Sequence, residues 1–232
     1  MNPTSIEYVD VTWNPMVGCL FHCWYCYGRR IMRSSKCELC RKYIPHPHEE
    51  RLYQPLKVKR HKRILLCSVS DLYFYPDYTY RRRVPDVVSM SRQHTFIVLT
   101  KNPYQMMRES RVERYSKNIP NLWCGTSIDT KENKVLRLPF LRHTDATIRL
   151  ISLEPMLEDI DLSEDELHNI DWVIIGGLTL PKGRVQHPKR EWVDKVVRIC
   201  DRLNIPLFIK DNVGYRTDIR EYPKIGLGRW LK

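Results

Sequence analysis

Five of the eight cysteines lie within residues 19–40, and three of them have a spacing typical of a metal centre. Cys19, Cys23 and Cys26 form a C-x3-C-x2-C pattern. Three thiolates at this spacing can hold three irons of a cubane [4Fe–4S] cluster and leave the fourth iron without a protein ligand. An open iron can chelate S-adenosylmethionine, and one electron from the cluster can then cleave the sulfonium bond to give a 5′-deoxyadenosyl radical. Zinc on the same thiols is the alternative, although structural zinc usually takes four ligands.

A second set of metal-ligating residues follows in the segment CELCRKYIPHPH. Cys37, Cys40, His46 and His48 offer two thiols and two imidazoles, which are the donors of a closed tetrahedral zinc site. The segment is rich in charge and proline, so a metal would stabilise it where a hydrophobic core cannot. We expect a structural zinc that fixes a basic flap beside the active site, where the basic residues of 29–33 and 57–63 could meet phosphate. Reduced free cysteines with solvated histidines, or an auxiliary iron–sulfur cluster, are the alternatives.

The rest of the chain alternates short apolar runs with helix-like stretches, and these elements would position the two sets of metal-ligating residues. The apolar runs have few polar positions, as expected for parallel strands that are covered on both faces. The alternating order predicts an α/β fold, a partial (β/α) TIM-like barrel of parallel strands with a loop insertion that contains the second Cys/His set. We expect one domain over residues 1–232, with the inserted basic loop at about 31–60. The expected strands are 7–13, 63–68, 95–100, 122–128, 147–153, 171–177 and 206–210, and the expected helices are 79–93, 103–117, 131–142 and 190–203.

Most of the expected strands end in polar residues. In a parallel barrel the active site lies at the carboxyl ends of the strands, so these side chains should converge on one mouth beside the cluster loop. Ser, Thr and Asp at such positions also cap helices, which is the alternative for each of them; Glu154 and Lys210 do not suit a cap. The residues concerned are Ser68, Asp71, Thr100, Lys101, Ser127, Asp129, Ser152, Glu154, Lys210 and Asp211.

The cysteine pattern, with the aromatic Tyr25 directly before Cys26, resembles the signature of the radical S-adenosylmethionine superfamily. The resemblance implies that Cys19, Cys23 and Cys26 hold the cluster after the first strand, with Tyr25 near the adenine. Further motifs along nearly the whole chain are similar to a phage-type three-Cys-motif subfamily of unassigned function. These motifs are TWNPMVGC (12–19), SVSDLYF (68–74), FIVLTKNP (96–103), GTSID (125–129), ISLEPML (151–157), DWVIIGG (171–177) and FIKDNVG (208–214).

The same resemblance suggests roles for the strand-end residues. Ser68 or Asp71 would hold the methionine amino group, and Lys101, Ser127 and Glu154 would contact the ribose, the carboxylate or the substrate. A salt-bridge network at the barrel mouth is the alternative for each. The candidate catalytic residues are Glu154, Lys210 and Asp211.

The chain departs from the subfamily pattern at two positions. Leu178 stands where we expect a glutamate after Gly176 and Gly177, and Asp211 stands where we expect a glutamine after Lys210. Both positions could lie in the substrate pocket, so the substrate can differ from that of relatives.

The net charge of +12 and the pI near 9.4 favour an anionic partner, and nucleic acid is the natural candidate. Basic residues concentrate in residues 29–43, 57–63 and 81–83. No apolar run is long enough for a membrane span, and the N-terminus lacks the features of a secretory signal, so we expect a cytoplasmic protein without disulfides. Three scattered cysteines are expected to be buried small hydrophobes: Cys67, Cys124 and Cys200.

Together these features predict a radical S-adenosylmethionine enzyme that modifies or repairs a nucleic acid (tRNA, other RNA or DNA) or acts on a nucleotide-like substrate. Radical modification of a peptide or protein is one alternative. A non-enzymatic nucleic-acid-binding protein, in which all the clustered cysteines and histidines hold zinc, is the other. The enzyme would need a separate one-electron donor such as ferredoxin or flavodoxin, because the chain has no further ferredoxin-type cysteine series. A partner protein that supplies the substrate is a further candidate.

Overall fold

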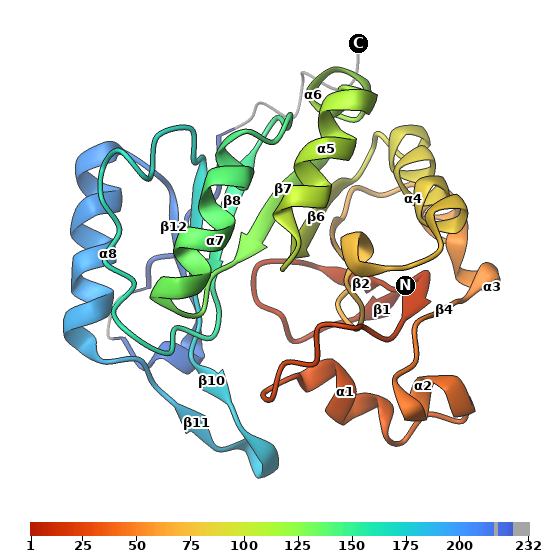
Figure 1. The fold of residues 1–232 in the computed structure, drawn as a ribbon, viewed down its shortest axis with the longest axis horizontal. Helices are drawn as coiled ribbons and strands as arrows, with labels where there is room; N and C mark the ends of the chain where they lie inside the picture. Colours follow the sequence, from red (N-terminus) through yellow and green to blue (C-terminus); the bar gives the residue numbers. More distant parts are fainter. Residues whose placement is uncertain (216–217, 225–232) are drawn as a thin grey trace.

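An open sheet of eight strands forms the centre of the computed structural model, which describes residues 1–215 and 218–224 (Figure 1). All neighbouring strands pair in parallel except β1 (Asn2–Pro3), which is antiparallel to β2. The sheet does not close, because the edge strands β1 and β12 do not pair. This confirms the partial (β/α) barrel. The parallel strands, in their order in the sheet, are β2 (Val11–Trp13), β5 (Arg63–Leu66), β6 (Thr95–Thr100), β7 (Leu122–Ser127), β8 (Arg149–Leu153), β9 (Trp172–Ile175) and β12 (Leu207–Ile209).

Helices cover the outer face of this sheet, close to the positions expected from the sequence. The expected helix at 103–117 is divided in two because Arg114 adopts a left-handed conformation with φ of 50°. Between β8 and β9 the chain forms no helix in residues 154–171, all of which the structure describes, so the βα alternation is interrupted there. The helices are α4 (Tyr78–Met90), α5 (Pro103–Glu113), α6 (Tyr115–Asn118), α7 (Lys131–Arg142) and α8 (Arg190–Leu203).

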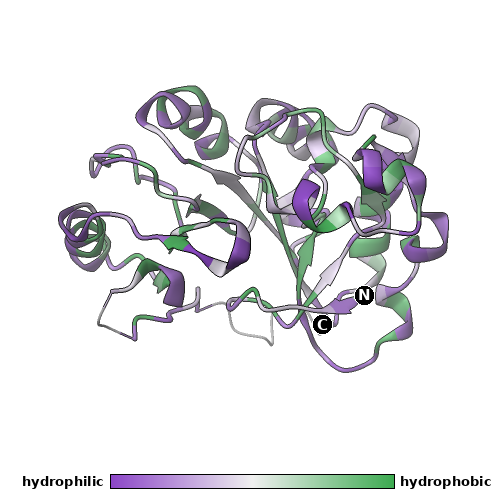
Figure 2. Ribbon diagram, turned by 90° about the horizontal axis from the view of Figure 1, so that it is seen from below, coloured by the Kyte–Doolittle hydropathy of each residue, from purple (hydrophilic) through white to green (hydrophobic). Residues whose placement is uncertain are grey.

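Alternate residues of each strand enter two separate apolar clusters. Ile64 and Leu66 pack toward the helices, whereas Leu65 between them belongs to a cluster without helix residues on the concave face. Aromatic rings fill this concave face: the Trp172 ring lies 5.9 Å from both the Tyr8 and the Trp123 rings. Figure 2 shows the apolar strands inside and polar colouring on the outer helices. Burial on both faces explains why the strands read as continuous apolar runs.

The segment expected as an inserted loop has short elements of its own. It contains α2 (Glu38–Lys42), β4 (His46–Pro47), α3 (Glu49–Leu52) and the 3-10 turn η1 (Pro55–Lys57). Strand β4 pairs with β3 (Met16–Val17), which ends two residues before Cys19, the first cysteine of the C-x3-C-x2-C pattern. The insertion therefore packs back on the start of the cysteine loop and, with α1 (Tyr27–Met32), lies at the end of the sheet where β2 terminates (Figure 1).

In the part of the chain that the structure describes, no helix is both long and apolar enough to span a lipid bilayer.

A buried histidine links the insertion to the barrel and predicts a pH dependence of stability. His94 is 1% exposed; its Nδ1 accepts a hydrogen bond from Lys62 N (3.1 Å), and its Nε2 donates to Pro55 O (3.2 Å). Burial lowers the pKa of His94, so the folded protein holds a neutral imidazole while the unfolded chain protonates near pH 6.5. We expect the contribution of His94 to the unfolding free energy to be constant above this pH and to fall as the pH drops below it.

Urea unfolding at pH 7.5 and 5.5 measures this effect. His94→Gln should reduce the loss of stability between the two pH values, whereas His143→Gln, at an exposed position, should leave the loss as it is in the unmodified protein. The same pH dependence in all three proteins would contradict the assignment.

Candidate active site

The cysteine loop begins where the first parallel strand ends. Past β2, Gly18 forms a parallel bridge with Ser70, with Gly18 N donating to Val69 O (3.1 Å) and Ser70 Oγ donating to Gly18 O (2.9 Å). Gly18 has φ of +92°, and any side chain there would collide with the backbone of Ile44. The pairing of β2 with β5 is thus continued by one bridge, which places Cys19 beside the carboxyl end of the sheet.

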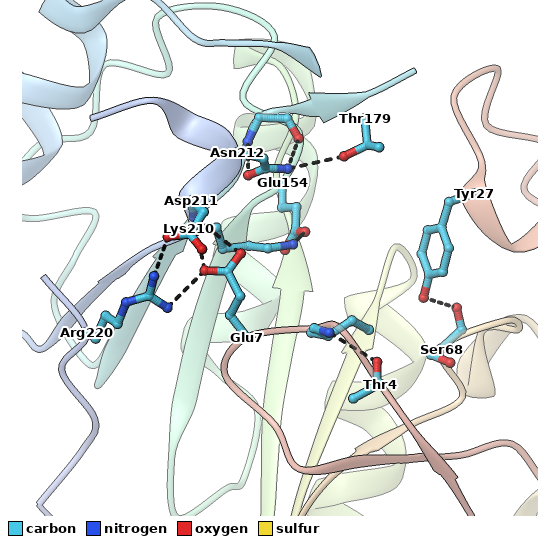
Figure 3. Close-up of polar contacts among 12 residues, drawn as sticks. Thr4, Glu7, Tyr27, Ser68, Glu154, Thr179, Lys210, Asp211, Asn212 and Arg220 are labelled. Atoms are coloured by element: carbon cyan, nitrogen blue, oxygen red, sulfur yellow. Dashed lines mark hydrogen bonds and ion pairs between the residues drawn. The ribbon is translucent and has the colours of Figure 1, made fainter. Parts of the chain in front are cut away.

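A buried asparagine reinforces the same junction. Asn14 Oδ1 accepts hydrogen bonds from Ser68 Oγ (3.1 Å) and Val69 N (3.2 Å). The Ser68 carbonyl in turn accepts from the Tyr27 hydroxyl, as Figure 3 shows. Ser68, expected to contact a methionine amino group, therefore lies directly between the end of β5 and helix α1.

The three thiols of the loop are partly buried and affect one another electrostatically. Burial, with smaller contributions from Asp71 and the other two thiols, raises the pKa of Cys19 to about 12, and burial also raises the pKa of Cys23, against the opposing effect of Lys101. Cys26 Sγ caps α1 and accepts a hydrogen bond from Arg29 N (3.3 Å). Partly buried thiols that oppose each other's ionisation suit a positively charged metal group, which is the chemistry of an iron–sulfur cluster ligand set.

These three thiols do not form a compact ligand set in the structure. Within the described residues, one set of at least three His, Cys, Asp or Glu side chains has all its ligand atoms within 4.8 Å of one another, and Cys19, Cys23 and Cys26 are not in it. Ligands of one tetrahedral zinc lie within about 4 Å of each other, given Zn–S bonds of about 2.3 Å. A wider spread is expected when each thiol holds a different iron of a cubane.

Asp129 joins the cysteine loop to the ends of strands β6 and β7 and to helix α7. Its carboxylate accepts a hydrogen bond from the Tyr25 hydroxyl, and it lies 3.3 Å from Arg137 Nη1 and 4.0 Å from Lys101 Nζ. Burial alone would raise the pKa of Asp129, but Lys101, the Tyr25 hydroxyl and Arg137 together hold it below its ordinary value. Arg137 also donates to the Ser127 carbonyl (2.7 Å). Tyr25, Lys101 and Ser127, all expected to bind the cofactor, are thus brought together around one carboxylate.

Asp71 accepts three hydrogen bonds from the protein itself. It is 7% exposed and accepts hydrogen bonds from Tyr73 N (3.0 Å), Thr100 Oγ1 (2.7 Å) and Lys101 N (2.8 Å). Its side chain caps the 3-10 turn η2 (Leu72–Phe74). For Asp71 the structure therefore shows the capping contact that the sequence left open as the alternative.

The three candidate catalytic residues divide into a pair and an outlier (Figure 3). Lys210 Nζ forms an ion pair with Glu154, and both side chains are largely buried, at 11% and 24% exposed. Asp211 instead turns outward: its carboxylate is 79% exposed and pairs with Arg220, which also contacts Glu7. The structure places Glu154 and Lys210 together at the strand ends and separates Asp211 from them.

The two positions that depart from the subfamily pattern have different surroundings. Leu178 is 3% exposed and begins a small hairpin of β10 (Leu178–Thr179) and β11 (Val185–Gln186). A side chain at Gly176 would collide with Glu154, so that carboxylate lies over the end of β9. Asn212, next to Asp211, exchanges two hydrogen bonds with the backbone of Gly177, at 2.9 and 3.0 Å. Thus Asn212, and not Asp211, faces the Gly176–Gly177 turn.

The second Cys/His set comes together as the spacing predicts. The ligand atoms of Cys37, Cys40, His46 and His48 all lie within 4.8 Å of one another. Sulfur-to-Nε2 distances are 3.5 Å for Cys37–His46, 3.4 Å for Cys40–His46 and 3.3 Å for Cys40–His48. Tetrahedral zinc with the usual bond lengths requires S···N separations of about 3.5 Å, so the set fits this ion.

The basic segments of the sequence do not all reach the mouth. Arg81, Arg82 and Arg83 form ion pairs with Glu109, Glu113 and Glu49. Residues 57–62 lead into the first residue of β5, so they lie at the amino end of the sheet, opposite the cysteine loop. The expectation that this segment flanks the mouth was therefore wrong.

Other cations surround the mouth from two sides. Arg29, Arg30 and Arg33 lie on α1 or at its C-terminal end, and Arg30 donates to Thr179 O of the β10–β11 hairpin (3.2 Å). The exposed Lys182 and Arg184 lie in that hairpin. None of these five forms an ion pair with a carboxylate among residues 1–215 and 218–224. Figure 1 shows α1 and the hairpin at the same end of the molecule.

Sequence reasoning missed Asn14, Tyr27 and Arg137 as site residues. Asn14 lies in the motif TWNPMVGC and could have been selected from it. Arg137 gives no comparable signal, because it lies on α7 beside the buried Leu138 and an arginine in a helix is ordinarily solvated. Its role follows from burial against Asp129, which only the fold establishes.

Comparisons with known proteins place the chain in a family and a fold. Residues 3–232 match the family described as "Protein of unknown function (DUF5131)". The fold is similar to spore photoproduct lyase complexed with dinucleoside spore photoproduct, with a TM-score of 0.61 and 11% identity over 90% of this chain and 78% of that chain. Two single-residue variants of that lyase give a TM-score of 0.60 at 11% and 12% identity over the same shares. No curated protein matches the sequence.

The buried carboxylate at the centre of the site yields a stability prediction. Asp129→Ala would leave Arg137, whose side chain is 5% exposed, without its ion-pair partner, and we expect a loss of about 3 to 5 kcal/mol in the free energy of unfolding. As a control, Asp165→Ala removes a carboxylate that is 90% exposed and 3.7 Å from Arg142, which should cost less than about 1 kcal/mol. Urea denaturation measures both, and equal effects would contradict the role of Asp129.

Proposed function

The chain belongs to the DUF5131 family, and from its site we propose that it is a radical S-adenosylmethionine enzyme acting on nucleic acid. In this proposal Cys19, Cys23 and Cys26 hold a [4Fe–4S] cluster, and the second Cys/His set holds a structural zinc. When bound, the cluster supplies an electron that cleaves S-adenosylmethionine to a 5′-deoxyadenosyl radical. The finer assignment to the phage-type three-Cys-motif subfamily stays a prediction.

One observation carries the proposal: a loop with three partly buried cysteines follows the first parallel strand of an open (β/α) barrel, at the carboxyl ends of the strands. Active sites of parallel barrels lie at this end. Spore photoproduct lyase, which has a similar fold, is itself a radical S-adenosylmethionine enzyme. Among the described residues, the three thiols are not in the one set whose ligand atoms all lie within 4.8 Å of one another, which favours a cluster over the alternative of a purely zinc-binding protein.

Different residues around the loop would contact different groups of S-adenosylmethionine. Tyr25 would lie against the adenine, since its ring is fixed by the hydrogen bond to Asp129. Lys101 supplies a cation near the loop for the methionine carboxylate, which is the anionic group of that ligand. Ser68 is a better partner for the methionine amino group than Asp71, because the Asp71 carboxylate already accepts three hydrogen bonds.

The Glu154–Lys210 pair lies within electrostatic reach of the cysteine loop. The charge of Glu154 contributes to the raised pKa of Tyr27 on α1, where burial is the larger cause. We assign both residues to the substrate side of the mouth, where an ion pair between largely buried groups can exchange its hydrogen bonds for those of a polar substrate. Asp211 is less suited to catalysis because it is exposed and paired with Arg220.

Charge and an exposed aromatic ring support a nucleic acid as the substrate. Arg29, Arg30 and Arg33 lie on one side of the mouth, and Lys182 and Arg184 lie on the other. Trp24, in the middle of the cysteine loop, is 72% exposed. Arginines for phosphates and an accessible aromatic ring for base stacking are the usual means of binding single-stranded or extruded nucleotides. Spore photoproduct lyase, which has a similar fold, forms a complex with a dinucleoside, and this agrees with the proposed substrate class.

The proposed reaction needs a one-electron donor, for which ferredoxin or flavodoxin are the candidates, since one cluster cannot reduce itself. A protein with a cytoplasmic location would meet both donor and nucleic acid there.

The test uses protein purified and reconstituted without oxygen, then reduced with dithionite. We expect a brown protein with about four irons per chain that converts S-adenosylmethionine to 5′-deoxyadenosine. Incubation with RNA and DNA from cells grown in deuterated medium should transfer deuterium into 5′-deoxyadenosine. Transfer from a deuterated protein pool alone would overturn the assignment to nucleic acid.

Matched cysteine variants test the cluster assignment. Cys23→Ala should lose the iron and the cleavage of S-adenosylmethionine, because it removes one of three ligands. Cys200→Ala, at a buried position in α8, should keep both. Cleavage that survives in Cys23→Ala would show that the cluster is held elsewhere.

A further inference from the structure

The second Cys/His set is joined to the cysteine loop by backbone pairing. Val17 pairs with His46 across the β3–β4 ladder, and His48 N donates to Pro15 O (2.7 Å). Segment 15–17, which leads to Cys19, is therefore paired with residues 46–48, which include both histidines. The close approach of Gly18 to the Ile44 backbone completes this contact.

The two histidines are oriented for metal binding by their second nitrogens. His46 Nδ1 lies 2.8 Å from Ile44 O, and His48 Nδ1 lies 2.9 Å from Glu50 Oε1. A proton on each Nδ1 satisfies these contacts and leaves the Nε2 lone pairs directed at Cys37 and Cys40. Carbonyl and carboxylate partners of this kind fix the tautomer of metal-ligating histidines and are a regular feature of zinc sites.

Tyr43, which lies between these ligands in the sequence, contacts Cys26, a ligand of the proposed cluster. Tyr43 follows α2 in a left-handed conformation with φ of 57° and is 5% exposed. Its hydroxyl oxygen lies 3.5 Å from Cys26 Sγ, and Gly28 leaves room for it, since a Cβ there would come within 2.5 Å. When Cys26 is a thiolate, the hydroxyl is the group of the two that can donate the hydrogen bond.

We propose that Cys37, Cys40, His46 and His48 form a zinc knuckle that positions the cluster loop, with Tyr43 as the positioning residue that donates a hydrogen bond to the Cys26 thiolate. This inference rests on the proposed cluster at Cys19, Cys23 and Cys26. The zinc ion fixes the segment 37–48 at both ends, and that segment holds both sides of the loop: β3 before Cys19 through β4, and Cys26 through Tyr43. Four protein ligands leave zinc no open position, so its role is structural.

Metal analysis tests the knuckle apart from the cluster. In the iron-free Cys23→Ala background we expect about one zinc per chain, and we expect none when Cys40→Ala or His46→Ala is added. His168→Ala, at an exposed position, should keep the zinc. Iron in place of zinc at these residues, or zinc that survives both ligand substitutions, would overturn the knuckle. If the unmodified protein binds no cluster at all, the proposed function fails. The zinc content then still shows whether Cys37, Cys40, His46 and His48 bind zinc.

Tyr43→Phe tests the coupling in a variant that keeps the ring and all metal ligands. We expect unchanged zinc and iron contents but a more negative reduction potential of the cluster, because a hydrogen bond to a ligating sulfur stabilises the reduced state. Tyr53→Phe, in the same insertion and 47% exposed, should leave the potential unchanged. An unaltered potential in Tyr43→Phe would overturn the role of Tyr43.

Loss of zinc should also loosen the cluster. In His46→Ala with an intact cysteine loop, we expect a chelator to remove iron several-fold faster than from the unmodified protein, followed as the decay of the visible absorbance. Equal rates of iron loss in a zinc-free variant would show that the knuckle does not position the loop.

Discussion

The site depends on the parallel pairing of β2 with β5 and on its continuation beyond the ends of both strands. The register Trp13↔Leu66 leads, a few residues later, to the Gly18–Ser70 bridge and to the hydrogen bonds of Asn14 with Ser68 and Val69. These contacts fix the start of the cysteine loop against the carboxyl end of the sheet. Without them the thiols would be a flexible set of ligands, and preorganisation of the site would be lost.

Charge balance is the second constraint on this site. A buried carboxylate, two cations and a tyrosine hydroxyl compensate one another around Asp129, and the thiols oppose one another's ionisation nearby. This charge balance suits the proposed cluster and a ligand with a carboxylate. Arginines on α1 and cations on the β10–β11 hairpin extend this positive field to the rim, where a polyanion would be attracted from solution.

The strands and helices were predictable from the sequence because each is a short segment with one consistent pattern of apolar residues. The apolar runs at 95–100 and 122–128 became β6 and β7 almost unchanged, since burial on both faces leaves few polar positions. The second Cys/His set was also predictable, because ligand type and local spacing determine it within twelve residues, from Cys37 to His48.

What the sequence could not show depends on contacts between distant segments. Arg137 reaches Asp129 only because α7 packs beside β7, and Asp211 turns away from Lys210 because Arg220 and Glu7 lie on the other side. Residues 57–62 were expected at the mouth on charge alone. Their place at the amino end of the sheet follows from their position directly before β5; the expected strand at 63–68 already implied this, although the charge pattern did not.

The central claim is that three cysteines hold a cluster whose fourth iron is open to S-adenosylmethionine. Electron paramagnetic resonance of the reduced, reconstituted protein tests this most directly. We predict a [4Fe–4S] signal whose g values change when S-adenosylmethionine is added, because the ligand binds the open iron. A signal that is the same with and without S-adenosylmethionine would contradict the account.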